Sequence, residues 1–293
     1  MVNKDDRVSL EQEPAVLDLI RRALEEDVAG GDVTTETLVD ANRTAKAVIA
    51  ARHAMTLSGL RIAAAVFHQL DERIATTLLA ADGERVEAGR AVLRLAGPAR
   101  AILTGERTAL NLLQRMTGIA TATAAMMRVL AETGVQLLDT RKTVPGLRAL
   151  DKYAVACGGG TNHRIGLYDA ILIKDNHLAF WRENHKGTLA DAVRAARVAH
   201  PSLKIEIEVD TLAQLREALP GHPDWVLLDN MTPKQLRQAV EICAGICKTE
   251  ASGGITAETL PEVARTGVTA ISVGALTHSV RAADLGLDFE SDE

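Results

Sequence analysis

The sequence predicts an α/β barrel that follows a smaller α+β unit. Short runs rich in β-branched and apolar residues recur through the second half of the chain, and helical segments separate them. The carboxylates Glu208, Asp229 and Glu250 follow one another at steps of 21 residues along these runs. Strands that alternate with helices at such an interval are typical of parallel βα units. Because at least six strands follow in one series, we expect a barrel rather than an open doubly wound sheet.

The first part of the chain mixes helices and strands. Apolar periodicity and turn residues predict its elements. In order, they are a helix over 16–27, a loop over 30–38, a strand over 45–52, a helix over 60–70, two strands over 73–80 and 91–97 around a tight turn, and a long helical stretch over 102–134. We expect the last stretch to be two helices that break near Gly118.

The second part repeats one unit of strand and helix. The expected strands are 135–140, 169–175, 204–210, 225–230, 248–254 and 269–275. The expected helices between them include 188–200, 212–219, 232–243 and 257–267. All of these segments have lengths that are ordinary for βα units.

Composition excludes several classes of protein. The 293 residues carry a formal net charge of −6, and only 7 are aromatic, so we expect no nucleic-acid-binding surface. No apolar stretch is long enough to span a membrane, and the N-terminus lacks the apolar segment of a signal peptide. The three cysteines do not resemble a disulfide framework, and Cys243 and Cys247 lack further metal ligands nearby. We expect a cytoplasmic protein.

Polar residues follow each of the six predicted strands. In an α/β barrel the active site lies at the carboxyl ends of the strands. The segment 141–174 holds six Lys or Arg but only two acids, although the protein is acidic. Arg141, Lys142 and Lys174 directly follow apolar strands, so we expect them at this face, where they would bind a small polyanion. For Arg148 and Lys152, a solvated helix face explains the charges equally well.

Glycine-rich segments predict loops that wrap a ligand. Gly158–Gly160 stands next to His163 and Arg164, which favours a ligand-binding loop over a structural histidine. Ser252, Gly253 and Gly254 end one strand, and Gly274 ends the next. Turns of this kind on the last two barrel strands form phosphate sites in barrel enzymes. The alternative is a pair of tight turns, and His278 either contacts the phosphate or packs.

Two carboxylates end neighbouring strands of the predicted barrel. Glu208 and Asp229 would hold ribose hydroxyls or a Mg²⁺ ion bound to pyrophosphate, because Mg²⁺ takes one or two carboxylates plus phosphate oxygens. Ion pairing with the neighbouring Lys and Arg residues is a compatible alternative.

Two runs of the sequence resemble the signature of the quinolinate phosphoribosyltransferases: DTRKTVPGLR and CGGGTNHRIGLYDAILIKDNH. Shorter segments elsewhere in the chain resemble the same family: EEDVAGGDVTT, GERTALNLLQRMTGIAT, EIEVD, LLDN, EASGGI and SVGALTHS. The resemblance covers roughly residues 16–287. It implies an incomplete, seven-stranded α/β barrel at 116–278 and an N-terminal α/β sandwich domain at 1–115, on which the tail 279–293 packs.

The resemblance also implies a pentosyltransferase reaction. Quinolinate would attack C1 of phosphoribosyl pyrophosphate through its ring nitrogen, pyrophosphate would leave, and loss of CO₂ would give nicotinate mononucleotide for NAD synthesis. It further implies Mg²⁺ as the cofactor and a homodimer, in some members assembled into a hexamer. Neither a nucleic acid nor a membrane is an expected partner.

The resemblance assigns roles to individual residues. Lys142, Lys174, Glu208 and Asp229 are the expected catalytic residues, and Glu208 and Asp229 the expected Mg²⁺ ligands. The expected substrate-binding residues are Arg107 from the neighbouring subunit, Arg141, His163, Arg164 and Lys174 for the quinolinate carboxylates, and Ser252, Gly253, Gly254, Gly274 and His278 for the 5′-phosphate.

Two alternatives stay open at this point. A sister group associated with molybdate transport shares the fold and some of these motifs. A barrel lyase would instead use Lys174 to form a Schiff base, since a lysine at a strand end is also an aldolase arrangement. The cations around Lys174 favour anion binding over the lyase.

Overall fold

A computed structural model describes residues 9–185 and 187–290 of the chain. The parts of the predicted domains at 1–8 and 291–293 lie outside the described residues. The chain forms two compact units. Unit 1 consists of residues 1–122, 145–159 and 280–293, and unit 2 of residues 123–144 and 160–279.

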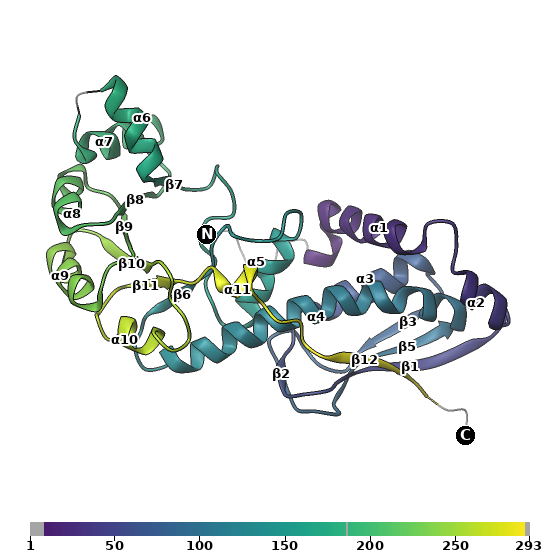
Figure 1. The fold of residues 1–293 in the computed structure, drawn as a ribbon. Coiled ribbons are helices and arrows are strands. Elements are labelled where there is room, and N and C mark those ends of the chain that lie inside the picture. Colours follow the sequence, from purple (N-terminus) through teal and green to yellow (C-terminus); the bar gives the residue numbers. More distant parts are fainter. Residues whose placement is uncertain (1–8, 186, 291–293) are drawn as a thin grey trace. The chain divides into compact units, whose positions relative to one another are not determined.

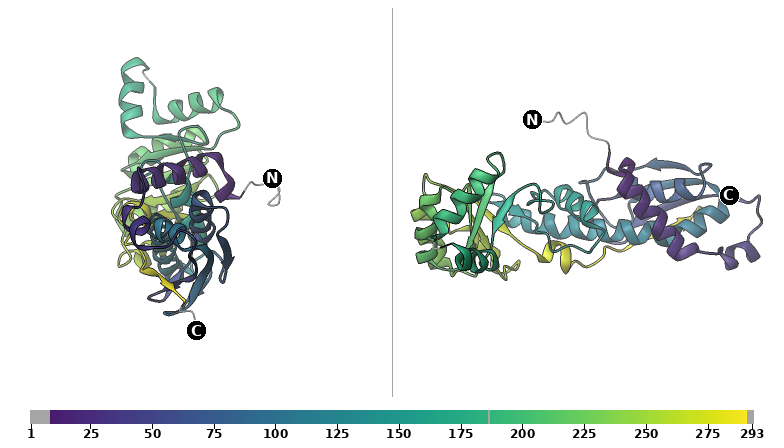
Figure 2. Two further views of the ribbon diagram at one scale, coloured as in Figure 1. Left: turned by 90° about the vertical axis from the view of Figure 1, so that its right-hand side faces the viewer. Right: turned by 90° about the horizontal axis from the view of Figure 1, so that it is seen from above.

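Unit 1 is built on a four-stranded antiparallel sheet in the order β12-β1-β5-β3. Helix α3 packs against β3 and β5, and α1 packs against α3 (Figure 1, Figure 2). The strands are β1 (Thr44–Ala51), β3 (Ala75–Leu78), β5 (Ala91–Pro98) and β12 (Leu285–Phe289), with a separate pair β2 (Met55–Thr56) and β4 (Arg85–Val86). The helices are η2 (Leu10–Gln12), α1 (Pro14–Val28), α2 (Val33–Leu38), α3 (Leu60–Leu70), α4 (Ala99–Leu130) and α5 (Arg148–Cys157).

Two expectations for unit 1 are wrong. Residues 33–38 form the short helix α2 rather than a loop, because the Asp32 side chain caps it by accepting from Thr35 N at 3.0 Å. Helix α4 runs without a break through Gly118. A Cβ at 118 would overlap the carbonyl oxygen of Arg281. Gly118 therefore serves the close approach of the chain that leads into β12, and it does not end a helix.

Unit 2 contains a six-stranded parallel sheet in the order β6-β11-β10-β9-β8-β7, with helices on its outer side (Figure 1). The strands are β6 (Gln136–Leu138), β7 (Ile171–Ile173), β8 (Ile205–Val209), β9 (Trp225–Asp229), β10 (Lys248–Ser252) and β11 (Ala270–Ser272). The helices are α6 (Asp175–Asn184), α7 (Leu189–Ala199), α8 (Leu212–Ala218), η3 (Leu219–Gly221), α9 (Pro233–Cys243), α10 (Leu260–Ala264) and α11 (Ala275–His278).

The sheet of unit 2 curves into a barrel that does not close. Strands β6 and β7 are its two edges, and within the described residues they do not pair with each other. A seventh strand would stand between them, where the structure has a single bridge between Leu138 and Thr161. The α/β architecture with an incomplete barrel and an N-terminal unit is confirmed, with six strands rather than seven in this part of the chain.

Candidate functional site

A cavity of about 400 Å³ lies at the carboxyl ends of the parallel strands in unit 2. Residues from every strand of the sheet, or from the segment that follows it, line this cavity. They are Thr140, Arg141, Lys142, His163, Arg164, Leu172, Lys174, Glu208, Leu227, Asp229, Glu250, Ser252 and Ser272. The strands bring these residues together because parallel strands end at the same edge of a sheet.

Eight predicted site residues line this one cavity. Four are cationic at neutral pH and stand at the ends of β6 and β7 or on the loop between them: Arg141, Lys142, Arg164 and Lys174. Arg141 Nε is buried and has no hydrogen-bond partner among the described residues, which is typical of a donor that binds a ligand. Burial and the neighbouring Arg141 lower the pKa of Arg164. The four cations lie close enough together to affect one another, and they give the cavity a cationic lining.

Lys174 and Glu208 form a close ion pair in this cavity. Lys174 Nζ lies 2.6 Å from Glu208 Oε2, and the two residues follow or end the neighbouring strands β7 and β8. The Lys174 backbone N–H donates to His177 Nδ1 at 2.9 Å, which fixes the start of α6 behind it. A lysine and a carboxylate are thus held together at the mouth of the barrel.

Asp229 is oriented by the residue that follows it. Asn230 Nδ2 donates to Asp229 Oδ2 at 2.6 Å, and the Asn230 backbone N–H donates to the carbonyl of Ser252 at 3.0 Å. Asn230 has a φ of 52°, a strained conformation for a residue other than glycine. A Cβ at Gly253 would overlap the Asn230 side chain. The glycine thus lets the ends of β9 and β10 approach closely.

Gly274 provides a second close approach. A Cβ at this position would lie 3.1 Å from His278 Nε2 and 3.2 Å from Lys142 Cδ. Thr277 Oγ1 donates to the carbonyl of Lys142 at 2.9 Å, which connects α11 to the segment after β6. Gly274 and His278 therefore lie beside Lys142, although they do not line the cavity itself. At Gly254, which has a φ of 58°, a Cβ would meet open space.

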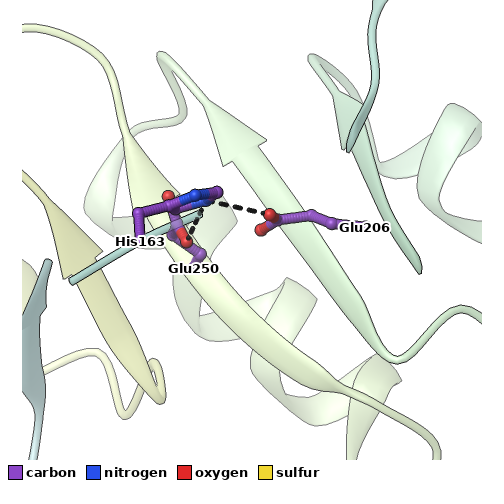
Figure 3. Close-up of side chains that lie close together, drawn as sticks. All are labelled: His163, Glu206 and Glu250. Atoms are coloured by element: carbon purple, nitrogen blue, oxygen red, sulfur yellow. Dashed lines mark hydrogen bonds and ion pairs between the residues drawn. The ribbon is translucent and has the colours of Figure 1, made fainter. Parts of the chain in front are cut away.

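His163 sits in the barrel interior between two glutamates from different strands. Its Nε2 lies 3.0 Å from Glu206 Oε2 and 3.5 Å from Glu250 Oε2 (Figure 3). The glutamate side chains are buried, and each has one oxygen, Oε1, without a hydrogen-bond partner among the described residues. The three ligand-type atoms lie within 4.8 Å of one another. We call His163, Glu206 and Glu250 the interior triad.

Charge and burial compete within the interior triad. Burial opposes a charged His163 ring, whereas the hydrogen bonds to Glu206 and Glu250 favour it and raise its pKa. Burial raises the pKa of Glu206 to about 7; His163 opposes this rise and Glu250 adds to it. His163 Nδ1 accepts the Arg164 N–H at 2.7 Å. A ring nitrogen accepts a hydrogen bond only while it carries no proton, so this contact opposes the second protonation and leaves the ring proton on Nε2, facing the carboxylates.

A second, smaller cavity of about 130 Å³ lies at the other side of the interior triad. His163, Arg164 and Glu250 line both cavities. Glu206 lines only the smaller one, together with residues near the amino ends of the strands such as Gln136 and Lys204. The interior triad thus separates the larger cavity from the lower part of the barrel.

The sequence places Glu250 and Asn230 on or after strands without indicating a role at the site, and it does not single out Glu206. Glu206 and Glu208 are two residues apart on one strand, so their side chains point to the same face. That spacing was the available signal for Glu206. Of the predicted residues, Arg107 lies outside this site: it is exposed on α4 in the part of that helix that belongs to unit 1.

The carboxylates Glu208 and Asp229 fit a Mg²⁺ ion that is shared with a substrate. They lie at the carboxyl ends of the neighbouring strands β8 and β9, and each has one oxygen engaged, by Lys174 and Asn230 respectively. The second oxygen of each carboxylate is then the donor that remains for a hard cation, which takes its other ligands from phosphate and water.

Family comparisons cover almost the whole chain. Residues 32–117 match the family model described as quinolinate phosphoribosyl transferase, N-terminal domain. Residues 119–288 match the C-terminal domain of the same family. No helix in the described part of the chain combines the length and the apolar character needed to cross a membrane.

Individual relatives agree with the family models. The chain is 44% identical to a nicotinate-nucleotide pyrophosphorylase (carboxylating) of Mycobacterium leprae, over 94% of this chain and 97% of the relative. It is 37% identical to a chloroplastic enzyme of the same name from Oryza sativa, over 94% and 77%. The structure of the nicotinate-nucleotide pyrophosphorylase from Francisella tularensis superposes with a TM-score of 0.88 at 40% identity, covering 94% and 96%. This chain belongs to the quinolinate phosphoribosyltransferase family.

Proposed function

We propose that the chain transfers the phosphoribosyl group of phosphoribosyl pyrophosphate to quinolinate and releases CO₂. One observation carries the proposal: in a chain of this family, a single cavity is lined by four cations and by two strand-end carboxylates, one of which is ion-paired with Lys174. Both substrates are polyanions, so several cations are needed to bring them into contact.

The transfer needs no nucleophile from the protein. The quinolinate ring nitrogen forms a bond to C1 of the ribose while the bond from C1 to the pyrophosphate oxygen breaks. The transition state carries positive charge on the sugar and negative charge on the leaving group. Glu208 and Asp229 suit the first charge, and Lys142 and Lys174 the second. Mg²⁺, when bound, would neutralise charge on the pyrophosphate.

The second step is the loss of the 2-carboxylate. The bond between C2 and the carboxyl carbon breaks, CO₂ leaves, and the electron pair stays at C2 next to the ring nitrogen, which is now cationic. A proton from solvent then adds to C2 and gives nicotinate mononucleotide. The substrate supplies its own electron sink, so the protein has to hold the ring and stabilise charge.

The proposed quinolinate-binding residues are Arg141, Arg164 and Lys174, with His163 in the same cavity as the residue that orients Arg164. The proposed 5′-phosphate site consists of Ser252, Gly253, Gly254, Gly274 and His278. Arg107 would enter from a neighbouring subunit, which makes a homodimer, or a hexamer built from dimers, part of this proposal. A cytoplasmic location is also part of it, and the three free cysteines support a reducing compartment.

The Schiff-base alternative is less consistent with the site. Such a lysine needs a neutral amine, whereas Lys174 enters the cavity as the cation of a 2.6 Å ion pair. The sister group associated with molybdate transport is likewise not favoured, because curated relatives along most of the chain carry the pyrophosphorylase name.

The test is an assay of the purified protein with quinolinate, phosphoribosyl pyrophosphate and Mg²⁺. We expect CO₂ and nicotinate mononucleotide in equal amounts. Nicotinate, tested in parallel, should give little product, because one missing carboxylate leaves buried cations unpaired. The absence of product with quinolinate would refute the proposal. Borohydride trapping with a carbonyl substrate would then test the lyase.

A further inference from the structure

We propose that Glu206 and Glu250 are positioning residues for quinolinate: together they hold the His163 ring, and through it Arg164, in the geometry that receives the substrate carboxylates. This inference rests on the proposed function, and it concerns two carboxylates to which the family resemblance assigned no role.

Both ring nitrogens of His163 are engaged inside the protein. Nε2 faces the two glutamates at 3.0 and 3.5 Å, and Nδ1 accepts the Arg164 N–H at 2.7 Å (Figure 3). The His163 backbone N–H donates to Asp139 Oδ1 at 2.8 Å. Ring and backbone are therefore fixed by separate contacts, and the glutamates decide the ring orientation.

The ring orientation reaches Arg164 through a short path. The same imidazole that faces the glutamates accepts the amide proton of Arg164, and Arg164 Nη1 donates to the carbonyl of Ala170 at 3.0 Å. If the ring turned, the Arg164 amide would lose its acceptor. Arg164, whose side chain lines the cavity, would then be held by the hydrogen bond to Ala170 alone of these two contacts.

The burial of the glutamates indicates that their role is not simple stability. Glu250 is 1% exposed and Glu206 8% exposed, and each has an unpartnered oxygen. Buried carboxylates cost stability unless they are well paired, and apolar residues of similar size are often at least as stable. Their contacts with His163 are the feature that such apolar residues would lose.

Loss of either glutamate should weaken the binding of quinolinate and leave the binding of phosphoribosyl pyrophosphate unchanged. The interior triad touches the loop that carries Arg164, whereas the proposed phosphate site lies after β10 and β11. Glu250 is followed two residues later by Ser252 on the same strand, so an isosteric change at 250 is needed to leave that strand in place.

The experiment uses Glu250→Gln and Glu206→Gln, with the exposed Glu262→Gln as the matched control on the same unit. Binding is measured by calorimetry with benzene-1,2-dicarboxylate, which carries both carboxylates but no ring nitrogen and therefore cannot react. KM values for both substrates and the thermal midpoint are measured on the same preparations.

We expect each interior variant to bind the dicarboxylate about tenfold more weakly, because the charge-assisted hydrogen bond that holds His163 becomes a weaker neutral one. KM for quinolinate should rise with it, while KM for phosphoribosyl pyrophosphate and the thermal midpoint stay near those of Glu262→Gln. If one variant does not fold, the other tests the proposal alone.

Three results would overturn the inference. Unchanged dicarboxylate affinity in a folded variant would remove the positioning role, and equal rises in both KM values would indicate a general structural one. One equivalent of tightly bound zinc in the wild type, lost in Glu250→Gln, would make the interior triad a metal site instead. If the wild type itself neither binds the dicarboxylate nor turns over quinolinate, the proposed function fails before any variant is compared.

Discussion

Replacing Lys174 with alanine should change both the stability of the protein and its rate of turnover, and a second substitution can restore the stability without the turnover. In the wild type, Lys174 Nζ lies 2.6 Å from Glu208 Oε2; the side chains are 44% and 14% exposed. The substitution leaves Glu208 without its cation in a half-enclosed cavity. An unsatisfied buried charged group costs about 1–3 kcal/mol, and because Lys174 is partly screened by water we take about 1 kcal/mol.

That loss is measurable by thermal unfolding. For a protein of this size, about 1 kcal/mol lowers the thermal midpoint by about 2–4 °C. The double variant Lys174→Ala with Glu208→Gln removes the isolated charge, so its midpoint should return toward the wild type. A double variant as unstable as the single one would contradict the ion-pair explanation.

Turnover should behave differently from stability. Lys174 is assigned to the developing negative charge, and loss of one such group costs about 10²–10³-fold in rate. We therefore expect the single variant to fold and to lose at least about 100-fold in kcat, and the double variant to remain inactive although its stability recovers. Single-turnover measurements of nicotinate mononucleotide check this. A Lys174→Ala rate near that of the wild type would refute the assigned role.

Three further predictions concern other parts of the chain. Mixing inactive Arg107→Ala with inactive Lys174→Ala subunits should restore some activity, because the two defects then fall in different composite sites; no recovery despite proven subunit exchange would argue against a shared site. Gly118→Ala should lower the thermal midpoint, because the overlap with the Arg281 carbonyl costs about 1–3 kcal/mol and exceeds the roughly 1 kcal/mol gained in helix propensity; a raised midpoint would show that the chain near 281 moves freely. Hydrogen bonding to the Thr188 backbone, with Arg194, lowers the pKa of Asp191 to about 2, so its contribution to stability is present above the unfolded value near 3.8 and lost as pH falls toward 2. Urea unfolding should therefore show Asp191→Asn less stable than the wild type at pH 6, with a gap that narrows below about pH 4; a constant gap would contradict the assignment.

The alternation of strands and helices in unit 2 was predictable because it follows from local patterns. All six parallel strands lie within the predicted ranges, and helix α3 has the predicted limits of 60–70. The single helix α4 was not predictable in this way. A glycine within a helical pattern commonly indicates a break, and its contact with Arg281 depends on a residue far away in the sequence.

The site was predictable where residues follow strands, and less so where they point inward. Lys174, Glu208 and Asp229 were found because each stands at the end of an apolar run. Glu206 and Glu250 lie within strands, and the role of a carboxylate in that position can be predicted only when its hydrogen-bond partner is known. That partner, His163, comes from a loop about 40 residues before Glu206 and about 90 before Glu250, so no local spacing reveals it.

The carboxylates of the barrel interior also explain how so many cations are held together without a ligand. Glu206, Glu208, Asp229 and Glu250 all come from the neighbouring strands β8, β9 and β10. Without them, the cations that line the same cavity would repel one another. With them, Lys174 and His163 each have a partner before substrate arrives. A substrate anion then competes with Glu208 for Lys174. The binding free energy of the substrate therefore depends on how strongly Lys174 attracts the anion and how strongly it attracts Glu208. It follows that neutralising an interior glutamate should weaken quinolinate binding through His163, just as removing a cation weakens it at the cavity itself.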